Sequence, residues 1–422
     1  MRVLNIVHQY PPDFVGGTEL YTQTVARSLV TRGYAVSVLC PSKQPGNSAP
    51  PLVSADEDGV RVHRVPLGPR SANSVFFDTF TQRTLSTALA TVLQQERPNL
   101  IHIQHLMGLP ARLIDQITAA GIPFIVSLHD YWYVCANAQL LTNTRQEICA
   151  GPRWWINCGQ CAVARAGHPD WLVLAPAVAP LMGYRNRLLR RVLNKATWLI
   201  APTEFVRETY RQLGVPTDRM RVIPHGIEVP TELPAERPRL SETLRVAYIG
   251  GLAWQKGVHV VIEAVNGLSA RSVQLSIYGD TTAFPGYVTE LKQLAQHPQI
   301  HFAGRLARTE LWRVLRETDV IVVPALWYET ASLIIQEAFA AGVPVIASNL
   351  GALRERVRDN FDGLLVAPGN SAAWRAALHR CATEPELLPR LRQGIRPVRT
   401  MAEHLSDLEA LFGDTMVATP SQ

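Results

Sequence analysis

Short hydrophobic runs alternate with longer amphipathic segments along most of the chain. The runs are rich in β-branched residues, and the segments between them carry apolar residues at helical spacing. This alternation is typical of βαβ units with parallel sheets, so it predicts an α/β fold. In the first half, the predicted strands are residues 3–7, 35–39, 60–65, 100–103, 123–127 and 198–201.

A second series of the same kind begins after a proline-rich stretch. Its predicted strands are residues 246–249, 275–278, 300–302, 320–323, 344–347 and 363–366. We therefore expect two Rossmann-like domains in tandem. The expected segments are a first domain at 1–221 with an insertion at about 131–171, a linker at 222–240, a second domain at 241–398 and a C-terminal helix and tail at 399–422.

The composition fits this organisation. With 422 residues, 47% hydrophobic and 18% charged, the chain has a globular composition and the length of two or three domains. Its apolar stretches fall far short of the ~20 residues that span a bilayer, which excludes an integral membrane protein. The first residues resemble a strand rather than a secretory signal, and six cysteines do not make a disulfide scaffold. We therefore expect a cytoplasmic protein.

The formal net charge of +6 comes from 41 basic and 35 acidic residues, and most of the basic residues are scattered arginines. A nucleic-acid-binding protein would gather its positive charge on one face, so we expect no nucleic-acid partner. Contact with an anionic membrane or substrate stays open. The basic amphipathic segment 181–195 would lie on anionic lipid at the inner face of a membrane or, as we favour, pack as an ordinary surface helix.

Two segments of the first domain carry candidate binding residues. Gly16 and Gly17 follow the first predicted strand and begin a helix, where the backbone can approach a ligand closely and the helix N-terminus favours anions. His129 follows the fifth predicted strand, at the edge where open α/β sheets bind ligands. His102 and His105 are weaker candidates of the same kind, and we expect His102 to be structural.

The second domain repeats this arrangement with a lysine. Gly250 and Gly251 follow its first strand, and Lys256, one of four lysines in the chain, comes just after them. A glycine pair with a lysine at a helix start suits a diphosphate. The chain has no G-x-G-x-x-G fingerprint, which weighs against a dinucleotide oxidoreductase, and Lys256-Gly257 is the reverse of a P-loop order, so an ATPase is not indicated.

The most informative segment follows the strand at 320–323. Glu329 lies in the loop before a helix, and Ser332 is placed to cap that helix with its side chain. The same helix amides would otherwise bind phosphate oxygens. Glu337 falls within an apolar run, where a carboxylate needs a partner: either a ligand hydroxyl or an arginine in a buried salt bridge.

Glu329 and Glu337, with seven residues between them, resemble the E-x7-E motif of retaining glycosyltransferase family 4, which has the GT-B fold. Other segments are similar to that family's motifs over nearly the whole chain. They are the glycine loop at Gly16-Gly17, the histidine motif at His129-Asp130, the interdomain turn at Pro224-His225-Gly226-Ile227 and the late strands after Gly342 and Gly363. The resemblance implies two Rossmann-like domains facing across a cleft, with the terminal helix crossing back to the first.

The resemblance also implies roles for matching residues. Glu329 and His129 would be the catalytic residues that contact the transferred sugar. The donor-binding residues would be Gly16, Gly17, Gly251, Lys256, Leu306, Glu329, Ser332, Leu333 and Glu337. Among them, Lys256 would neutralise the diphosphate and Glu337 would hold the ribose. One position departs from the family: many members carry arginine where Gly251 stands, so the diphosphate would lose one of two usual cations.

The function that this implies is sugar transfer with retention of the anomeric configuration. The donor would be a nucleoside diphosphate sugar, and the acceptor a hydroxyl of a glycan or a lipid-linked saccharide, as in polysaccharide biosynthesis. Peripheral contact with the inner face of a membrane stays open. Two rivals remain: a nucleotide-sugar epimerase or hydrolase on the same fold, and a catalytically inactive carbohydrate-binding scaffold.

Two groups of residues raise the question of metals. Asp56-Glu57-Asp58 spells D-x-D, but we interpret it as a turn before a strand, and the resembled family needs no metal or other cofactor for catalysis. Cys135, Cys149, Cys158 and Cys161 crowd into the insertion, and Cys158 and Cys161 have metal-ligand spacing. They would form a structural zinc site, less readily an iron–sulfur cluster, or, as we favour, remain reduced thiols.

Overall fold

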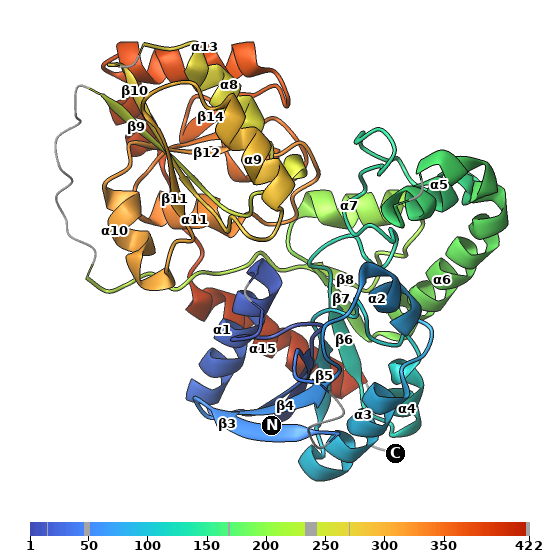
Figure 1. Ribbon diagram of the computed structural model, residues 1–422. Coiled ribbons are helices and arrows are strands. Elements are labelled where there is room, and N and C mark those ends of the chain that lie inside the picture. The colour runs from blue at the N-terminus through green and yellow to red at the C-terminus, as the bar shows by residue number, and fades with distance from the viewer. Residues whose placement is uncertain (15, 46–50, 168, 233–242, 270, 419–422) are drawn as a thin grey trace. The chain divides into compact units, whose positions relative to one another are not determined.

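The computed structural model describes residues 1–422 except 15, 46–50, 168, 233–242, 270 and 419–422, so residues 233–240 of the expected linker lie outside the described residues. The chain forms two compact units, which are coloured along the sequence in Figure 1. Unit 1 comprises Met1–Pro224 and Met401–Gln422, and unit 2 comprises His225–Thr400. Within the described ranges, every helix is too short or too polar to cross a bilayer.

Unit 1 is built on an eight-stranded sheet with the order β3-β4-β2-β1-β5-β6-β7-β8. Its strands are β1 (Arg2–Ile6), β2 (Ala35–Ser42), β3 (Val53–Glu57), β4 (Val60–Pro66), β5 (Leu100–Ile103), β6 (Phe124–Ser127), β7 (Trp198–Ala201) and β8 (Met220–Val222). Its helices are α1 (Gly17–Thr31), α2 (Ala72–Asp78), α3 (Arg83–Glu96), α4 (Leu113–Ala119), α5 (Ile156–Arg165), the short η1 (Pro169–Leu174), α6 (Ala175–Lys195), α7 (Glu204–Gln212) and α15 (Met401–Ala418).

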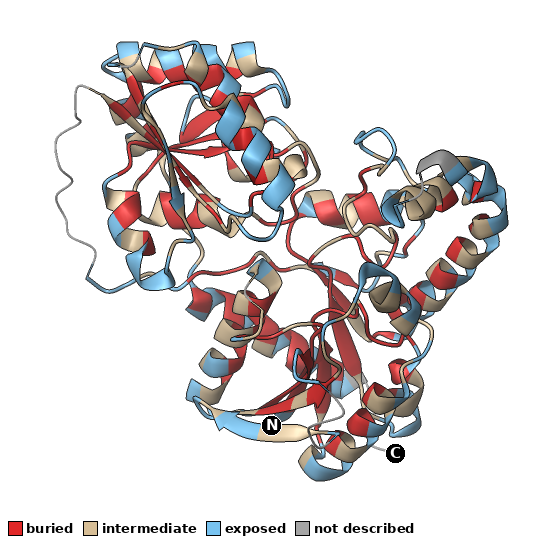
Figure 2. Ribbon diagram, viewed as in Figure 1, coloured by how far each residue is buried: buried red, intermediate tan, exposed pale blue. Residues whose placement is uncertain are grey.

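The central strands of this sheet are buried on both faces, which is why they appear in the sequence as continuous apolar runs (Figure 2). β1 pairs in parallel with β2 on one side and with β5 on the other. The strands that follow β1 are therefore added first on one side of it, at β2, and later on the other side, at β5, so the strand order reverses between β1 and β5. Such a switch point opens a crevice at the carboxyl ends of the strands, which is where ligands bind in open α/β sheets.

The edge of this sheet contains an antiparallel strand that the sequence pattern does not predict. β3 is only half-buried, and it pairs with β4 through a turn at Asp58 and Gly59, both with positive φ. Asp56 pairs with Arg61 across the hairpin at 2.8 Å. Asp58 therefore lies in a turn before a strand, as expected, whereas Asp56 and Glu57 belong to the unpredicted strand β3.

Unit 2 has a six-stranded parallel sheet with the order β11-β10-β9-β12-β13-β14. Its strands are β9 (Leu244–Ile249), β10 (Val273–Tyr278), β11 (Ile300–Gly304), β12 (Val320–Val323), β13 (Val345–Ser348) and β14 (Gly363–Val366). Its helices are η2 (Trp254–Lys256), α8 (Val258–Asn266), α9 (Pro285–Leu294), η3 (Arg308–Glu310), α10 (Leu311–Arg316), α11 (Leu333–Ala340), α12 (Leu353–Arg356), α13 (Ser371–Thr383) and α14 (Leu387–Gly394). The switch point here lies between β9 and β12.

Helix α15 belongs to unit 1 although it follows unit 2 in the sequence. Its apolar stripe, Met401, Leu405, Leu408 and Leu411, lies in the same buried cluster as strands β1 and β2 and helix α1. Figure 1 shows α15 alongside α1, and the two helices are in contact. Tyr21 of α1 hydrogen-bonds His404 of α15 through its hydroxyl and the ring Nε2, at 2.7 Å.

Candidate functional site

In unit 2, two loops at the switch point pack directly on each other. Gly257 follows η2 with φ +73°, and a Cβ there would lie only 1.9 Å from the carbonyl oxygen of Pro324. Leu326 N–H also donates to the carbonyl oxygen of Gln255 at 2.8 Å. Only glycine at 257 allows this approach, so the loop after β9 is held against the loop after β12. This contact brings Lys256 next to the E-x7-E segment.

Lys256 and Glu329 form the central ion pair of this site. Lys256 Nζ donates to Glu329 Oε1 at 2.6 Å, and Trp327 Nε1 donates to the same oxygen at 2.9 Å. The ammonium also lies 5.0 Å from the centre of the Trp327 ring. Glu329 is nearly buried, whereas about a third of the Lys256 side chain is exposed. A cation is thus fixed at the switch point with part of its surface still open to an anion.

Glu337 pairs with an arginine that sequence reasoning did not single out. Arg308, in η3 after strand β11, donates to Glu337 Oε1. Burial raises the pKa of Glu337, and the positive charge of Arg308 opposes that shift. The salt-bridge alternative for Glu337 is therefore present in the structure. Arg308 is itself more than half exposed, so the pair lies at the surface edge of the buried helix α11.

Ser332 occupies the N-cap position of α11, but it does not cap the helix with its side chain. Its backbone is left-handed, with φ +49°, and no side-chain hydrogen bond reaches the first turn. A side-chain cap needs an extended backbone at this position, which corrects the sequence expectation. Ser332 therefore contributes only its backbone, which lies directly before the first helical residue, Leu333.

The other expected donor-binding positions of unit 2 lie at the same edge of the sheet. Gly251 follows β9 and is exposed, and a Cβ there would meet nothing within 4 Å. Leu306 follows β11 and is half-buried. Gly304, at the end of β11, has φ +75° and accepts a hydrogen bond from Gly279 N–H at 2.9 Å.

In unit 1, the glycine loop positions a carboxylate. Gly16 is the N-cap of α1, and a Cβ there would lie 2.5 Å from Glu19 Oε2. Glu19 folds back over the helix start and lies 3.5 Å from His8 Nε2. Burial raises the pKa of Glu19, whereas the amides of Glu19 and Gly16 oppose this shift. Gly17, in contrast, has open space around its Cβ position.

His105 connects this loop to the one after β6. The amide of Met107 donates to His105 Nδ1 at 3.0 Å, so Nδ1 is an acceptor and Nε2 carries the hydrogen. Nε2 then donates to Asp130 Oδ2 at 2.9 Å. The His105 ring also lies 4.2 Å from the His8 ring, centre to centre. The carboxylates of Glu19 and Asp130 thus flank two histidines at the switch point of unit 1.

His129 belongs to a separate buried chain of hydrogen bonds. Its Nε2 lies 2.9 Å from Gln104 Oε1, and the Gln104 amide nitrogen lies 3.1 Å from His102 Nδ1. His102 Nε2 in turn lies 2.8 Å from Ser127 Oγ. Burial lowers the pKa of both His102 and His129 to about 3, so both rings are neutral near pH 7. His102 is therefore structural, as expected, and His129 is positioned by it through Gln104.

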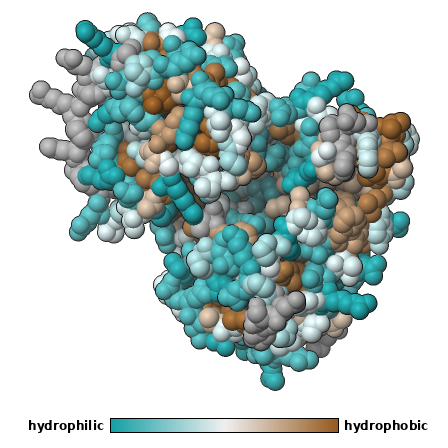
Figure 3. All heavy atoms as spheres, viewed as in Figure 1, coloured by the Kyte–Doolittle hydropathy of each residue, from teal (hydrophilic) through white to brown (hydrophobic). Residues whose placement is uncertain are grey.

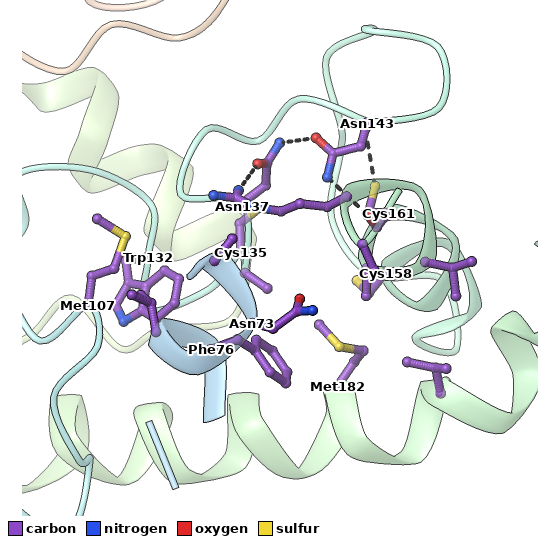
Figure 4. Close-up of a pocket in the computed structure, with 18 of the residues that line it drawn as sticks. Asn73, Phe76, Met107, Trp132, Cys135, Asn137, Asn143, Cys158, Cys161 and Met182 are labelled. Atoms are coloured by element: carbon purple, nitrogen blue, oxygen red, sulfur yellow. Dashed lines mark hydrogen bonds between the residues drawn. The ribbon is translucent and has the colours of Figure 1, made fainter. Parts of the chain in front are cut away.

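The insertion surrounds a pocket of about 530 Å³, which lies wholly in unit 1 (Figure 4). Its apolar side comes from Phe76 and Phe77 of α2 and from Met182 of α6. Its other side carries all four cysteines of the insertion together with several asparagines. His8 also lines the pocket, so it connects with the histidine and carboxylate cluster.

Helix α6 contains the basic segment 181–195, and it packs as an ordinary surface helix, the alternative favoured from the sequence. Its apolar residues from Ala175 to Leu193 are buried along one side. Arg191 pairs with Asp115 at 2.7 Å, and Arg190 donates to the carbonyl oxygen of Gly214 at 3.0 Å. These basic side chains therefore serve contacts within unit 1.

Sequence reasoning found Glu329, Lys256, Glu337 and His129, because each stands at a recognisable place after a strand or glycine pair. His8 and Glu19 flank the glycine loop and Asp130 follows His129, but the sequence pattern gives them no role, and it does not point to Gln104 or Arg308. A signal existed for Glu19, since an acidic residue in the first turn of a helix is favoured by the free backbone amides there. Arg308 had none, because 29 residues separate it from its partner.

The comparisons with known proteins agree with this geometry. Residues 16–226 match the family model described as "Glycosyl transferase 4-like domain", and residues 243–384 match "Glycosyl transferases group 1". The chain is 26% identical to glycogen synthase of Mycobacterium tuberculosis over 411 residues, covering 94% of this chain and 89% of that protein. It is 25% identical to D-inositol 3-phosphate glycosyltransferase of Xylanimonas cellulosilytica over 405 residues, covering 90% and 87%.

Solved structures share the fold at lower identity. Sucrose-phosphate synthase from Thermosynechococcus elongatus has a TM-score of 0.74 at 19% identity and covers 99% of both chains. Anabaena HepE, solved in complex with UDP and glucose, has a TM-score of 0.67 at 17% identity and covers 97% of this chain and 99% of its own. These likenesses establish the GT-B fold. With the family match over half of its length, the chain belongs to the glycosyl transferase 4-like family, and it is a glycosyltransferase.

Proposed function

We propose that the protein moves a hexose from a nucleoside diphosphate sugar to a hydroxyl group, with retention of the anomeric configuration. The observation that carries this proposal is the Lys256–Glu329 ion pair at the switch point of unit 2. It provides a partly exposed cation for a diphosphate and a carboxylate for sugar hydroxyls within 2.6 Å of each other. Glu337, the fifth residue of α11, would then accept hydrogen bonds from the ribose hydroxyls beside Arg308.

A uridine diphosphate hexose is the first donor to test. HepE was solved with UDP, with UDP and glucose, and with UDP-glucose, and the trehalose-6-phosphate protein from E. coli with UDP-2-fluoro glucose. These are properties of relatives that share the fold, and they support a nucleotide-sugar donor here. By the family resemblance, the segment from Gly304 to Leu306 would read the base through its backbone.

Catalysis in this proposal rests on positioning and on charge. Lys256 and the backbone amides at Ser332 and Leu333 would stabilise the negative charge that develops on the leaving diphosphate. The leaving diphosphate would take the proton of the incoming hydroxyl, so no separate side-chain base is required. His129 is neutral, and its proposed role is to contact the transferred sugar through hydrogen bonds rather than through charge.

The acceptor that we propose is a glycan or lipid-linked saccharide held by unit 1. Several large apolar side chains are exposed around the beginning of α6, where Figure 3 shows hydrophobic residues gathered over α5 and α6. Trp171 is 54% exposed, Val173 is 81% exposed and Leu174 is 48% exposed. This patch supports an acceptor with an apolar portion, and it is also the surface on which peripheral membrane contact would rest.

The experiment that tests the function is a donor screen with purified protein, read out by nucleotide release with and without acceptor. We expect release to depend on an acceptor hydroxyl and the product to keep the donor's anomeric configuration. Release at the same rate without acceptor would indicate a hydrolase, and isomerised donor would indicate an epimerase. A scaffold would bind no nucleoside diphosphate in a calorimetric titration.

A further inference from the structure

Four of the six cysteines come from three separate segments of the insertion and line the same pocket. Cys135 lies on the loop that follows β6, Cys149 follows a short hairpin closed by the Leu141–Ile148 bridge, and Cys158 and Cys161 lie on α5. Figure 4 shows Cys135 on the loop and the two helix cysteines around this pocket. All four are free thiols. Nothing in the proposed transfer reaction uses them.

Two of these sulfur atoms already accept hydrogen bonds from backbone amides. Gly151 N–H donates to Cys149 Sγ at 3.4 Å, and Asn143 N–H donates to Cys161 Sγ at 3.4 Å. The side-chain amide of Asn157 donates to Cys149 Sγ as well, at 3.7 Å. The Cys149 thiol in turn donates to the carbonyl oxygen of Gly151 at 3.5 Å. Amide donors of this kind also hold thiolates, and metal sites use them to fix their ligands.

The insertion buries apolar residues at its start, from Tyr131 to Val134 and at Leu140 and Leu141, but the part around α5 buries little apolar surface. Gly159 is the one buried residue that the structure describes in α5, and Trp154 is 90% exposed. Within the insertion, Ala138, Leu140, Gln146, Trp154 and Trp155 all have positive φ values between 49° and 63°. Such strained positions persist only where the surroundings hold them, and segments with so little apolar burial commonly depend on a cross-link.

A buried cation lies next to the cysteines. Arg185 of α6 is fully buried, and it hydrogen-bonds to the carbonyl oxygen of Trp132 at 2.8 Å and to Asn186 Oδ1 at 3.0 Å. Among the described residues, no carboxylate forms an ion pair with it, and its Nε has no hydrogen-bond partner. Cys135, Asp130 and Cys158 lie within electrostatic range of this guanidinium, and Cys135 has the largest effect of the three. A buried charge of this kind is stable only if negative charge lies nearby.

We propose that Cys135, Cys149, Cys158 and Cys161 bind one structural Zn²⁺ as a four-thiolate site that cross-links the insertion. The four thiols release four protons, and the site carries a charge of −2, which Arg185 partly neutralises. Zinc fits because four thiolates form its usual closed tetrahedral site, with no position left for substrate. Among the described residues, no three metal-binding side chains (His, Cys, Asp or Glu) lie close enough together to share an ion. Zinc binding would therefore require the four cysteine side chains to turn into the pocket that they line.

The first test is the metal content of the full-length protein purified under reducing conditions. We expect about one zinc per chain in the wild type and in the control Cys381→Ala, whose cysteine lies in unit 2. The double variant Cys158→Ser/Cys161→Ser should retain less than a tenth of this amount. Zinc-free wild-type protein, iron with cluster absorption, or a disulfide among the four cysteines would each overturn the proposal.

A second measurement keeps the test decisive if the double variant does not fold. Cobalt added to the zinc-free wild type should give the visible bands of a tetrahedral thiolate complex, and the single variant Cys149→Ser should shift them. Adding Zn²⁺ should also protect the insertion from limited proteolysis in the wild type. A spectrum that is unchanged in Cys149→Ser would exclude that cysteine as a ligand. Because Lys256 and Glu337, the proposed diphosphate and ribose contacts, lie in unit 2, nucleotide binding tests the proposed function separately.

Discussion

At the scale of single residues, the Lys256–Glu329 pair is the feature on which the proposed donor binding rests. Replacing Lys256 with alanine should weaken nucleoside diphosphate binding about ten- to a hundredfold, because a hydrogen bond to a charged group is worth ~1.5–3 kcal/mol. Lys292→Ala, at an exposed lysine of α9, is the matched control. Calorimetric titration measures both, and equal affinity in the two variants would remove Lys256 from the site.

Gly251 allows the opposite experiment. Its Cβ position is open and its φ lies outside the left-handed region, so an arginine there should be accommodated without strain. Gly251→Arg should restore the second cation typical of the resembled family and raise nucleoside diphosphate affinity up to about tenfold. Gly251→Ala should leave the affinity unchanged. A lower affinity in the arginine variant would show that the diphosphate does not lie near this turn.

Glu337 of the Arg308–Glu337 pair can be a ribose ligand, a partner in a structural salt bridge, or both, and two variants measured side by side separate these roles. Glu337→Gln keeps the size of the side chain but removes its charge, whereas Arg308→Gln leaves a buried carboxylate without its partner. If Glu337 also binds the ribose, Glu337→Gln should weaken nucleotide binding several-fold, and Arg308→Gln should mainly lower the melting temperature. A melting-temperature loss in both variants with unchanged affinity would leave only the structural salt bridge.

These residues also show what a sequence can and cannot reveal about a site. Lys256 and Glu329 are recognisable because each stands in a characteristic place after a strand. The partners that fix them are set by tertiary contacts between distant segments, as with Arg308 and Glu337. The same holds for His105 and Asp130, which are 25 residues apart. Sequence therefore predicts candidate groups, whereas folding decides which groups pair.

At the scale of elements, the buried His102 within β5 makes unit 1 sensitive to acid. The pKa of His102 is about 3 in the folded state against 6.5 for the free side chain, so the unfolded chain binds more protons between these values. The stability contribution is complete above pH 6.5 and is lost as the pH falls toward 3. The free energy of unfolding should fall by up to ~1.4 kcal/mol per pH unit for this group.

Replacing the histidine isolates this contribution from other titrating groups. In His102→Gln, the melting temperature should fall less steeply between pH 7 and pH 5 than in the wild type, because glutamine does not titrate. Thermal unfolding at several pH values measures the difference in slope. Parallel curves would show that His102 does not remain neutral in the folded protein.

The elements themselves were predictable wherever burial imposes a continuous apolar run. All twelve predicted strands correspond to strands of the two sheets. The two edge strands of unit 1 were not predicted, because β3 is only half-buried and carries acidic residues and β8 has only three residues. The amphipathic stretch between the predicted strands at 60–65 and 100–103 forms two helices, α2 and α3. The helix ends between α2 and α3 because Thr79 is buried there, and its carbonyl oxygen accepts a hydrogen bond from Ala111 N–H at 2.9 Å.

At the scale of the whole molecule, α15 completes unit 1. Truncation after Thr400 removes this helix but keeps the pairing of Ile227 with Thr400 in unit 2. It should expose the apolar surface around α1 and impair transfer much more than nucleotide binding, because Lys256 and Glu329 are untouched. Dye binding, transfer assays and calorimetry follow these effects. Truncation after Ala418 is the control, and full transfer activity without α15 would contradict the prediction.

The split composition of unit 1 has a consequence for how the protein is made. The contiguous unit 2, residues 225–400, can fold as soon as it leaves the ribosome, whereas the core of unit 1 must wait for residues 401–412. At ~5–20 residues per second, this wait lasts roughly ten to forty seconds. During that interval the surface destined for α15 is open, which makes the half-finished first unit a client for chaperones.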